Sequence, residues 1–344
     1  MRFGTPDQFA SLREMLIESR YTEVSICQRR GQLTLREVES APCEDREIAD
    51  NLDVLIRLLL HGLPVEQSQA GKLLPPPLLA ALHGFDLIAP LGPDYQARLM
   101  LHPWGSLYVT SDSVRSAGNR LPDDFVFPAL TPQTGRFLAT LPDEPCDDLL
   151  DLCSGAGLAA LIAASGYARR VWACDVVGRA TRFAEFNRRL NNLSNLTTLE
   201  GDLYDPLQNL TFDRIVAHPP YVPSLQPLPA CLNGGPDGEQ ITRRILEGLS
   251  RRLRPGGRLY CSAMLSDRRG APLEHRLRAM LGHSAGEFDL IVFRREALTP
   301  LEYGLRLISL GQTAPLHIRQ LQERFEQLEI ERLVACSFSA HRRL

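Results

Sequence analysis

The chain has 344 residues, 44% of them hydrophobic and 23% charged; it is longer than one typical domain, and its composition excludes a disordered, collagen-like or coiled-coil protein. Its net charge of -3 at neutral pH gives no electrostatic reason to expect a nucleic acid as partner. No apolar stretch approaches the ~20 residues that cross a bilayer, so neither export nor membrane insertion is expected.

Residues 1–127 are predicted to form an accessory domain, because the strongest punctuation in the chain, at residues 121–132, separates two different patterns. Helices are expected at 6–19, 48–61 and 78–84, followed by β-type runs at 96–101 and 106–109. Helices followed by a small hairpin predict a winged-helix-like module. Such modules often bind DNA, but these 127 residues hold 12 basic and 17 acidic side chains, which favours a docking or dimerisation platform.

Residues 128–344 alternate between apolar β-type runs and helical patterns. Strands are expected at 148–153, 170–176, 197–202, 212–217, 257–263, 287–293 and 332–338. Helices are expected at 158–165, 179–192 and 238–253, with mostly helical sequence at 299–328. Apolar strands between helices are typical of a parallel sheet covered on both faces, so we predict an α/β fold with a doubly wound, mostly parallel sheet. Ligands bind such sheets at the carboxyl ends of the strands.

A small-residue loop follows the first of these strands, in the run Asp151-Leu-Cys-Ser-Gly-Ala-Gly157. Small residues between a strand and a helix let the backbone approach a ligand, and the start of the helix adds partial positive charge. The spacing is neither the dinucleotide fingerprint nor a phosphate-binding P-loop, because Cys153 replaces the first glycine and no Gly-Lys-Ser/Thr occurs. A nucleotide-like ligand is therefore expected.

Acidic residues end the next two predicted strands. Asp175 is placed to accept hydrogen bonds from both hydroxyls of a ribose, and Asp202 is placed to receive an exocyclic amine. Each alone would also suit a helix cap or a turn. Their joint placement after consecutive strands favours a nucleoside site.

The fourth strand runs into His218-Pro219-Pro220-Tyr221. Two successive prolines remove both backbone donors and stiffen the loop, so carbonyl oxygens are held outward as acceptors beside an aromatic ring. This arrangement suits an amine that is about to lose a proton or gain a methyl group.

With these motifs the sequence resembles the Rossmann-like S-adenosylmethionine-dependent methyltransferases, in the amino-methylating branch whose signature is Asn/Asp-Pro-Pro-Tyr/Phe. It is similar to the protein-glutamine methyltransferases of release factors and to the "small" group that modifies RNA bases. The resemblance covers residues 123–263, and it includes Gly234-Gly-Pro-Asp-Gly238, similar to the Gly-Gly-x-Asp-Gly of the glutamine enzymes. It implies a seven-stranded methyltransferase sheet with S-adenosylmethionine as cofactor.

The resemblance also implies roles for single residues. The methionine part of the cofactor and its loop would involve Asp151, Ser154, Gly155 and Gly157. Asp175 would hold the ribose, Asp202 would lie at the adenine amine, and Leu203 would pack on the adenine ring. The acceptor nitrogen would meet His218, the carbonyl of Pro219 and the ring of Tyr221.

His218 departs from the family pattern. A neutral imidazole offers one acceptor and one donor, whereas a carboxamide offers a carbonyl and an NH₂ group. With an ordinary pKa near ~6.5, His218 would serve as a general base or as a substrate contact. The alternative is a structural histidine in a degenerate motif.

The sequence therefore predicts a methyltransferase that acts on a nitrogen of a protein, peptide or small molecule, with residues 128–344 as the catalytic domain. A methyltransferase of RNA or DNA bases and a binding protein without turnover remain the alternatives. No metal is expected, because the other seven histidines show no ligand spacing and the eight cysteines include no C-x-x-C pair. The pattern of the cysteines does not suggest a set of disulfides, which favours a protein of the reducing cytoplasm. The helical segment around Tyr303 is expected to close over the acceptor, and the oligomeric state stays open.

Overall fold

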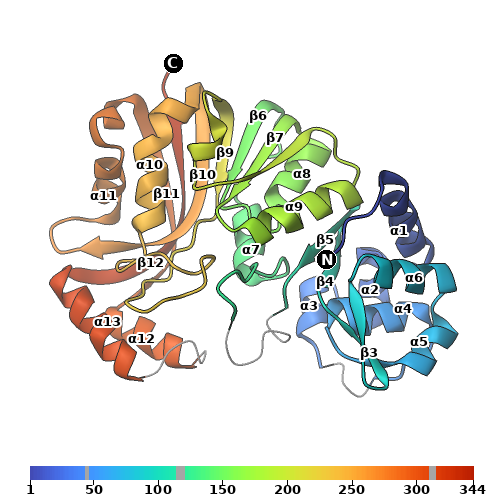
Figure 1. The fold of residues 1–344 in the computed structure, drawn as a ribbon. Coiled ribbons are helices and arrows are strands. Elements are labelled where there is room, and N and C mark those ends of the chain that lie inside the picture. Colours follow the sequence, from blue (N-terminus) through green and yellow to red (C-terminus); the bar gives the residue numbers. More distant parts are fainter. Residues whose placement is uncertain (43–45, 114–120, 310–314) are drawn as a thin grey trace.

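The computed structural model describes residues 1–42, 46–113, 121–309 and 315–344. A large sheet flanked by helices forms the C-terminal part, and a smaller helical module with two short sheets forms the N-terminal part (Figure 1). Cys43 lies outside the described residues, and the other seven cysteines are free thiols.

The strands of the large sheet are β6 (Cys146–Leu152), β7 (Ala168–Asp175), β8 (Leu196–Glu200), β9 (Phe212–Ala217), β10 (Leu253–Arg268), β11 (Phe288–Leu298) and β12 (Ile330–Arg342). In the described part of the chain these seven strands lie in the order β11-β12-β10-β9-β6-β7-β8. All are parallel except β12, which runs antiparallel between β10 and β11. The predicted α/β fold with a mostly parallel seven-stranded sheet is confirmed.

Side chains along the central strands alternate between two cores, so both faces of the sheet need helices to cover them. On β6, Leu149 belongs to the core that includes α8 (Leu158–Gly166) and α9 (Gly178–Leu190). The next residue, Leu150, belongs to the core that includes α10 (Gln240–Arg252) and α11 (Leu273–Met280). Both leucines are fully buried.

Strands β10, β11 and β12, at one edge of the sheet, are longer than predicted. β10 begins at 253 instead of 257 and ends at 268 instead of 263, and β12 spans 330–342 instead of 332–338. The two pair antiparallel from Arg258 opposite His341 to Arg268 opposite Ile330. The long ladder gives backbone partners to residues whose own pattern did not indicate a strand.

Two helices, α12 (Pro300–Ser309) and α13 (Pro315–Gln327), lie between β11 and β12 in the chain. They agree with the helical sequence predicted at 299–328, of which 310–314 lie outside the described residues. Tyr303 and Phe325 are buried between the two helices with ring centroids 6.3 Å apart.

The N-terminal module is built from α1 (Pro6–Glu18), α2 (Glu23–Arg30), α3 (Leu35–Ser40), α4 (Asn51–Leu55), η1 (Ile56–Leu60), β1 (Val65–Glu66), α5 (Gln67–Leu73), α6 (Pro76–Gly84), β2 (Ile88–Leu91), β3 (Asp94–Ala97), β4 (Met100–Trp104) and β5 (Leu107–Ser111). Strands β1, β3 and β2 form one antiparallel sheet, and β4 pairs with β5 in a hairpin. Helices followed by a small hairpin are in keeping with the winged-helix-like module predicted from the sequence.

One predicted strand of this module is wrong. The run 96–101 is split between the end of β3 and the start of β4, and the hairpin of β2 with β3 was missed. The sequence signal for this hairpin is Gly92-Pro93. Gly92 adopts a φ of 60° in the turn between the two strands, a conformation that favours glycine. Helices α2, α3 and α5 were also not predicted.

The N-terminal module shares a hydrophobic core with α8 and α9. Asn187 of α9 and Asn191, just past the end of this helix, form hydrogen bonds with the hairpin of β4 and β5. The amide oxygen of Asn187 accepts hydrogen bonds from the backbone N–H (2.8 Å) and the hydroxyl (2.7 Å) of Thr110. Its NH₂ group donates to the carbonyls of Thr110 (3.1 Å) and Ala156 (2.9 Å). Asn191 exchanges hydrogen bonds with the backbone of Tyr108 in the same way. The boundary at 127/128 stays a prediction, since the two parts pack as one body.

Replacing Asn187 with leucine is expected to destabilise the protein by about 2 to 4 kcal/mol, because the buried backbone groups of Thr110 and Ala156 would lose their partners. Urea unfolding followed by circular dichroism measures the change. The matched control is Asn192→Asp, at an exposed position just past the same helix, which should change the free energy of unfolding by less than about 0.5 kcal/mol. An equal loss in both variants would contradict the role given to Asn187.

Candidate active site

The carboxyl ends of four neighbouring strands lie level with one another. Leu152, near the end of β6, pairs with Ala217 of β9 on one side and with Cys174 of β7 on the other. Asp175, which ends β7, pairs with Glu200, which ends β8. The loops that follow these strands therefore start side by side, as expected for a ligand site of a doubly wound sheet.

Three alternate residues of the loop between β6 and α8 have left-handed backbone conformations. The φ angles are 57° at Cys153, 55° at Gly155 and 80° at Gly157. A Cβ atom on Gly157 would lie 3.0 Å from the Cβ of Ala184 in α9, so this glycine allows close packing of loop and helix. A Cβ atom on Gly155 would meet nothing within 4 Å. The loop thus has a packed side and an open side.

Two polar groups of this region are buried at the open side. The hydroxyl of Ser154 is buried and has no hydrogen-bond partner among the described residues. The carboxylate of Asp175 accepts hydrogen bonds from the backbone N–H groups of Gly155 (2.8 Å) and Val177 (2.9 Å). Burial raises the pKa of Asp175, although these two donors oppose the change. A ligand with hydroxyl or amino groups would supply the partner that Ser154 lacks.

Asp151 is fixed by the scaffold. Its carboxyl oxygen accepts a hydrogen bond from the backbone N–H of Ala160 (3.1 Å), in the first turn of α8. Burial raises the pKa of Asp151 to about 8, so the carboxyl group is mostly neutral at pH 7. The hydrogen bond between Asp151 and Ala160 therefore joins β6 to α8.

Asp202 makes an ion pair that the sequence did not reveal. Its two carboxylate oxygens accept hydrogen bonds from Arg244 of α10 at 3.1 and 2.8 Å. The next residue, Leu203, is buried in the core with a φ of 50°. Arg244 orients the carboxylate and leaves its remaining lone pairs for another donor. The predicted signal Gly-Asp gave no indication of this partner, which lies 42 residues further along the chain.

The loop after β9 places His218 between two aromatic rings. The imidazole stacks on Phe137 of α7 (Pro132–Leu138), with ring centroids 5.1 Å apart and an interplanar angle of 24°. The ring of Tyr221 lies 5.8 Å from that of His218. Burial, with a smaller contribution from Arg295, lowers the pKa of His218 to about 4. The imidazole is therefore neutral at pH 7.

The glycine-rich segment 234–238 packs directly against this loop. Val222 donates its N–H to Leu232 (2.9 Å), and Gly234 donates to Val222 (3.0 Å). A Cβ atom on Gly234 would lie 2.7 Å from the Cα of Tyr221, and one on Gly238 would lie 2.7 Å from the carbonyl oxygen of Tyr221. Only glycine permits this backbone contact, which fixes the position of the His-Pro-Pro-Tyr loop.

A family model covers the part of the chain that holds this site. Residues 129–285 match the methyltransferase small domain. The resemblance predicted from the sequence is thereby confirmed for this segment.

Curated relatives match part of the chain. It is 39% identical over 130 residues to a release factor glutamine methyltransferase of Moorella thermoacetica, covering 34% of this chain and 46% of that protein. It is 35% identical over 136 residues to a ribosomal protein uL3 glutamine methyltransferase of Bradyrhizobium diazoefficiens, covering 36% and 43%. A release factor glutamine methyltransferase of Rhodopirellula baltica is 32% identical over 168 residues, covering 42% and 56%. The chain spans about half the length of these relatives.

Within residues 129–285, a buried charge cluster anchors the glycine-rich segment. Glu239 is fully buried, and its carboxylate accepts hydrogen bonds from the N–H and the hydroxyl of Ser266, both at 2.7 Å. Three arginines surround the pair of carboxylates at Asp237 and Glu239, namely Arg243, Arg268 and Arg276. The sequence indicated Asp237 only within its motif and gave no sign of the cluster, because the members of the cluster come from four different elements.

Changing Glu239 to glutamine is expected to lower the free energy of unfolding by roughly 3 to 5 kcal/mol, because it leaves buried guanidinium groups without their carboxylate. Urea denaturation provides the measurement. Glu323→Gln, which removes an exposed partner of Arg319 on α13, serves as the control and should cost less than about 1 kcal/mol. Similar losses of the free energy of unfolding at both positions would show that burial of the cluster does not increase its contribution to stability.

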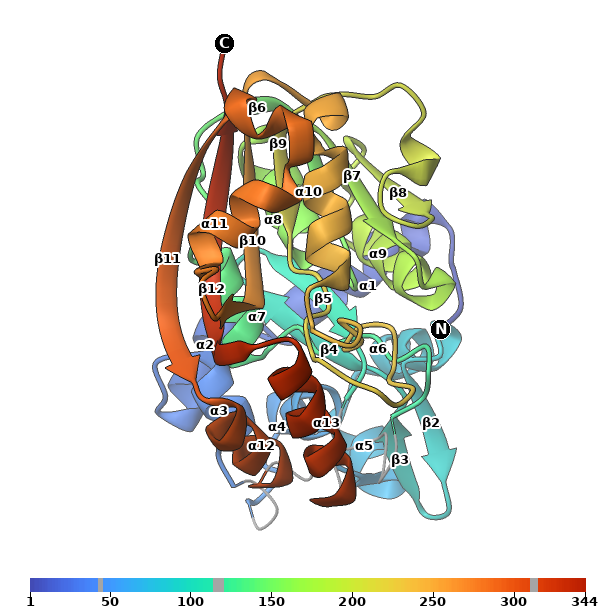
Figure 2. The same cartoon turned by 90° about the vertical axis from the view of Figure 1, so that its left-hand side faces the viewer.

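Helix α13 lies beside the loop that follows β9. Figure 2 shows α13 next to the loop that leaves β9. A cavity of about 570 Å³ is lined by residues of both segments, namely Leu225, Gln226, Pro236, Gln320, Glu323, Arg324 and Gln327.

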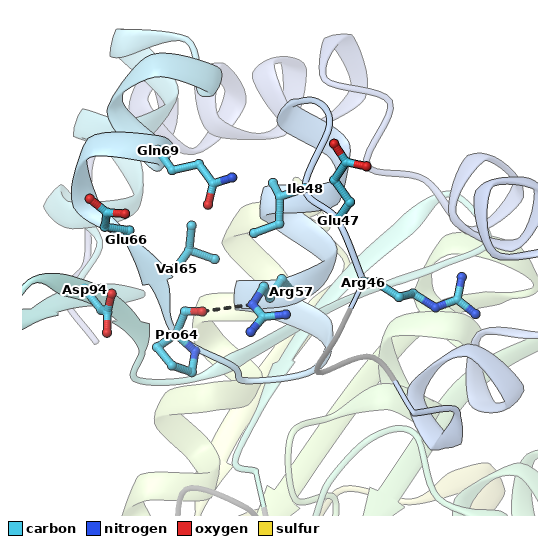
Figure 3. A pocket seen from close by; sticks show the side chains of 9 residues that line it. All are labelled: Arg46, Glu47, Ile48, Arg57, Pro64, Val65, Glu66, Gln69 and Asp94. Carbon is cyan, nitrogen blue, oxygen red and sulfur yellow. Dashed lines mark hydrogen bonds between the residues drawn. The ribbon is translucent and has the colours of Figure 1, made fainter.

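A second hollow, of about 550 Å³, lies in the N-terminal module (Figure 3). Its lining residues are Arg46, Glu47, Ile48, Arg57, Pro64, Val65, Glu66, Gln69 and Asp94. Arg57 donates a hydrogen bond to the carbonyl of Pro64 at 3.0 Å, which Figure 3 draws as a dashed line. Two arginines beside three carboxylates give this surface no basic character.

Among the residues the structure describes, no group of three His, Cys, Asp or Glu side chains is placed to hold a metal ion. None of the described helices is long and apolar enough to span a bilayer.

Proposed function

We propose that this protein is an S-adenosylmethionine-dependent methyltransferase that methylates a nitrogen of a protein or peptide. The observation that carries the proposal is the level arrangement of four strand ends, which brings the small-residue loop beside the His-Pro-Pro-Tyr loop. The relatives that match this segment are named for methylation of glutamine in proteins, which supports a protein acceptor.

The residues at the open side of the loop fit the cofactor. The unpartnered hydroxyl of Ser154 and the free space at Gly155 suit the methionine part, with Gly157 and Asp151 shaping the loop behind it. The buried carboxylate of Asp175 suits the ribose hydroxyls. Asp202 and Leu203, which follow β8, suit the adenine amine and ring. When bound, S-adenosylmethionine supplies an electrophilic methyl group on a sulfonium.

The acceptor loop orients the nucleophile. The neutral imidazole of His218 and the carbonyl of Pro219 accept hydrogen bonds from the N–H groups of the target, and Tyr221 packs against its plane. With a pKa of about 4, His218 is a weak base, so we assign it hydrogen-bond acceptance at pH 7. Positioning therefore supplies most of the catalysis, as expected for an in-line displacement at a methyl carbon.

Incubation with radiolabelled S-adenosylmethionine and fractionated cell extract tests the proposal. We expect label in protein, at an amide or amine nitrogen located by mass spectrometry, and none with Asp175→Ala. Label confined to RNA, DNA or small metabolites would overturn the protein acceptor. Cofactor binding without label in any fraction would favour the alternative of a binding protein. The free thiols suit the cytoplasm as the compartment from which the extract is taken.

A further inference from the structure

The acceptor site has a cationic side that the assigned residues do not explain. We propose that Arg295, assisted by Arg136, recognises a carboxylate of the acceptor, so that the substrate is an acidic peptide segment with an aspartate or glutamate within about two residues of the methylated nitrogen. This proposal rests on the proposed function and specifies its substrate class.

Arg295 occupies a β-bulge in β11, the strand at one edge of the sheet. Arg294 pairs with Cys336 of β12 and Glu296 pairs with Ala335, so Arg295 is the extra residue of β11 between them. Bulges re-aim a side chain and are common beside active sites. Here the guanidinium is turned back over β12, where it donates hydrogen bonds to the hydroxyl of Ser337 and to the carbonyl of Cys336 (3.2 Å).

A line of polar side chains leads from this guanidinium to His218. Ser337 is buried and shares a 2.7 Å hydrogen bond with Ser262 of β10. Ser262 follows Cys261, which pairs with Ala217, the residue before His218. Because neighbouring strands lie roughly 5 Å apart, Ser337 is about 10 Å from His218. The guanidinium therefore lies within reach of a substrate whose nitrogen is held at His218.

Electrostatic effects place a second arginine at the same loop. Burial raises the pKa of Tyr221, and both Arg295 and Arg136 oppose that rise. Arg136 belongs to α7 and precedes Phe137, on which His218 stacks. Arg295 lies on β11 and Arg136 on α7, so the two cations that act on Tyr221 come from different elements.

Neither arginine has an anionic partner among the described residues. In the described ranges of the chain, no carboxylate lies within 4 Å of the guanidinium of Arg295 or Arg136, whereas the adjacent Arg294 pairs with Asp267 and Glu274. Both arginines are exposed to solvent. Two solvent-accessible cations without internal counter-ions beside a substrate loop are suited to a carboxylate, to which guanidinium binds in bidentate fashion.

The surroundings favour an acidic peptide over a nucleic acid. The cavity next to the acceptor loop is lined by both Glu323 and Arg324, and the chain carries a net charge of -3, so the two arginines are not part of the broad basic surface that a nucleic acid needs. In an extended peptide, side chains two residues apart point the same way and lie roughly 7 Å apart. A glutamine at His218 would then bring an acidic side chain two positions away close to Arg295.

Two synthetic peptides test the proposal, acetyl-Gly-Asp-Gly-Gln-Gly-Asp-Gly-amide and the same peptide with serine in place of both aspartates. We expect the wild-type protein to methylate the aspartate peptide with at least about tenfold higher kcat/KM, through a lower KM. Arg295→Gln should abolish the preference, so that this variant methylates the two peptides with equal kcat/KM. Arg295→Glu should reverse it in favour of a peptide with lysines at the two positions. Arg136→Gln should weaken the preference by a smaller factor.

Arg343→Gln is the control, because Arg343 binds Asp289 at the opposite end of β11 and should leave the preference intact. Thermal unfolding of each variant identifies any loss of fold, and Arg295→Lys, which keeps the charge, should retain part of the preference. Equal kcat/KM for both peptides in the wild-type protein would overturn anion recognition while the proposed function stands. Absence of methylation and of binding for both peptides in the presence of S-adenosylhomocysteine would overturn both proposals.

Discussion

Replacing His218 with alanine is expected to lower kcat/KM for protein methylation by roughly 100- to 1,000-fold, because the target nitrogen would lose a preorganised acceptor. The stacked ring on Phe137 would also be lost, which leaves the loop without the contact that fixes its plane. His218→Asn, in contrast, is expected to stay within about tenfold of the wild-type rate, because its carboxamide oxygen also accepts a hydrogen bond. Single-turnover kinetics with labelled donor and the identified protein acceptor measure both variants.

The pH dependence distinguishes hydrogen-bond acceptance from general-base catalysis at the ordinary histidine pKa. Burial lowers the pKa of His218 to about 4, and the imidazole accepts a hydrogen bond only when it is neutral. The rate of the wild-type protein should therefore be flat from about pH 5 to 8 and should fall only as the pH drops through about 4. His218→Asn should lack this acid limb. An acid limb near pH 6.5, together with loss of activity in the asparagine variant, would show instead that the imidazole is the base.

Replacing Asp175 with alanine is expected to weaken the binding of S-adenosylhomocysteine about 100-fold or more. A hydrogen bond to a charged group is worth about 1.5 to 3 kcal/mol, and a ribose offers two hydroxyls to this carboxylate. The change also releases the N–H groups of Gly155 and Val177, so the loop loses part of its shape. Isothermal titration calorimetry provides the dissociation constants.

Asp205→Asn, at an exposed position of the short helix η3 (Asp205–Leu207), is the matched control and should change the affinity by less than about twofold. Burial raises the pKa of Asp175, so its carboxylate becomes protonated at a higher pH than that of an ordinary aspartate. As the pH is lowered, the affinity of the wild-type protein for S-adenosylhomocysteine should therefore begin to fall at that higher pH. Unchanged affinity in Asp175→Ala would place the ribose elsewhere.

The sheet and the strand-end residues were predictable because local pattern determined them. Each central strand is a short apolar run between helices, and Asp151, Asp175 and Asp202 stand at or near strand ends, where parallel topology brings ligand-binding groups together. The hairpin of β2 and β3 was missed because its strands are short and only partly apolar, so the Gly92-Pro93 turn carried most of the signal.

Interactions between distant segments could not be predicted in the same way. The ion pair of Asp202 with Arg244, and the contacts of Glu239 with Ser266 and Arg276, join residues 27 to 42 positions apart, for which a single sequence carries no pairing signal. The pKa of His218 depends on its burial against Phe137 and on Arg295, from segments on either side of it in the chain. For this reason the sequence left open a general base, a substrate contact or a structural histidine, and only the structure indicates that the imidazole is neutral at pH 7.

A crystal structure of the protein with S-adenosylhomocysteine tests the central claim most directly. We expect the ribose hydroxyls at Asp175, the amino acid part at Ser154 and Gly155, and the sulfur facing the turn that begins at His218. Binding of the compound at another surface, or an ordered loop with no ligand at a concentration that calorimetry shows to be saturating, would contradict the account.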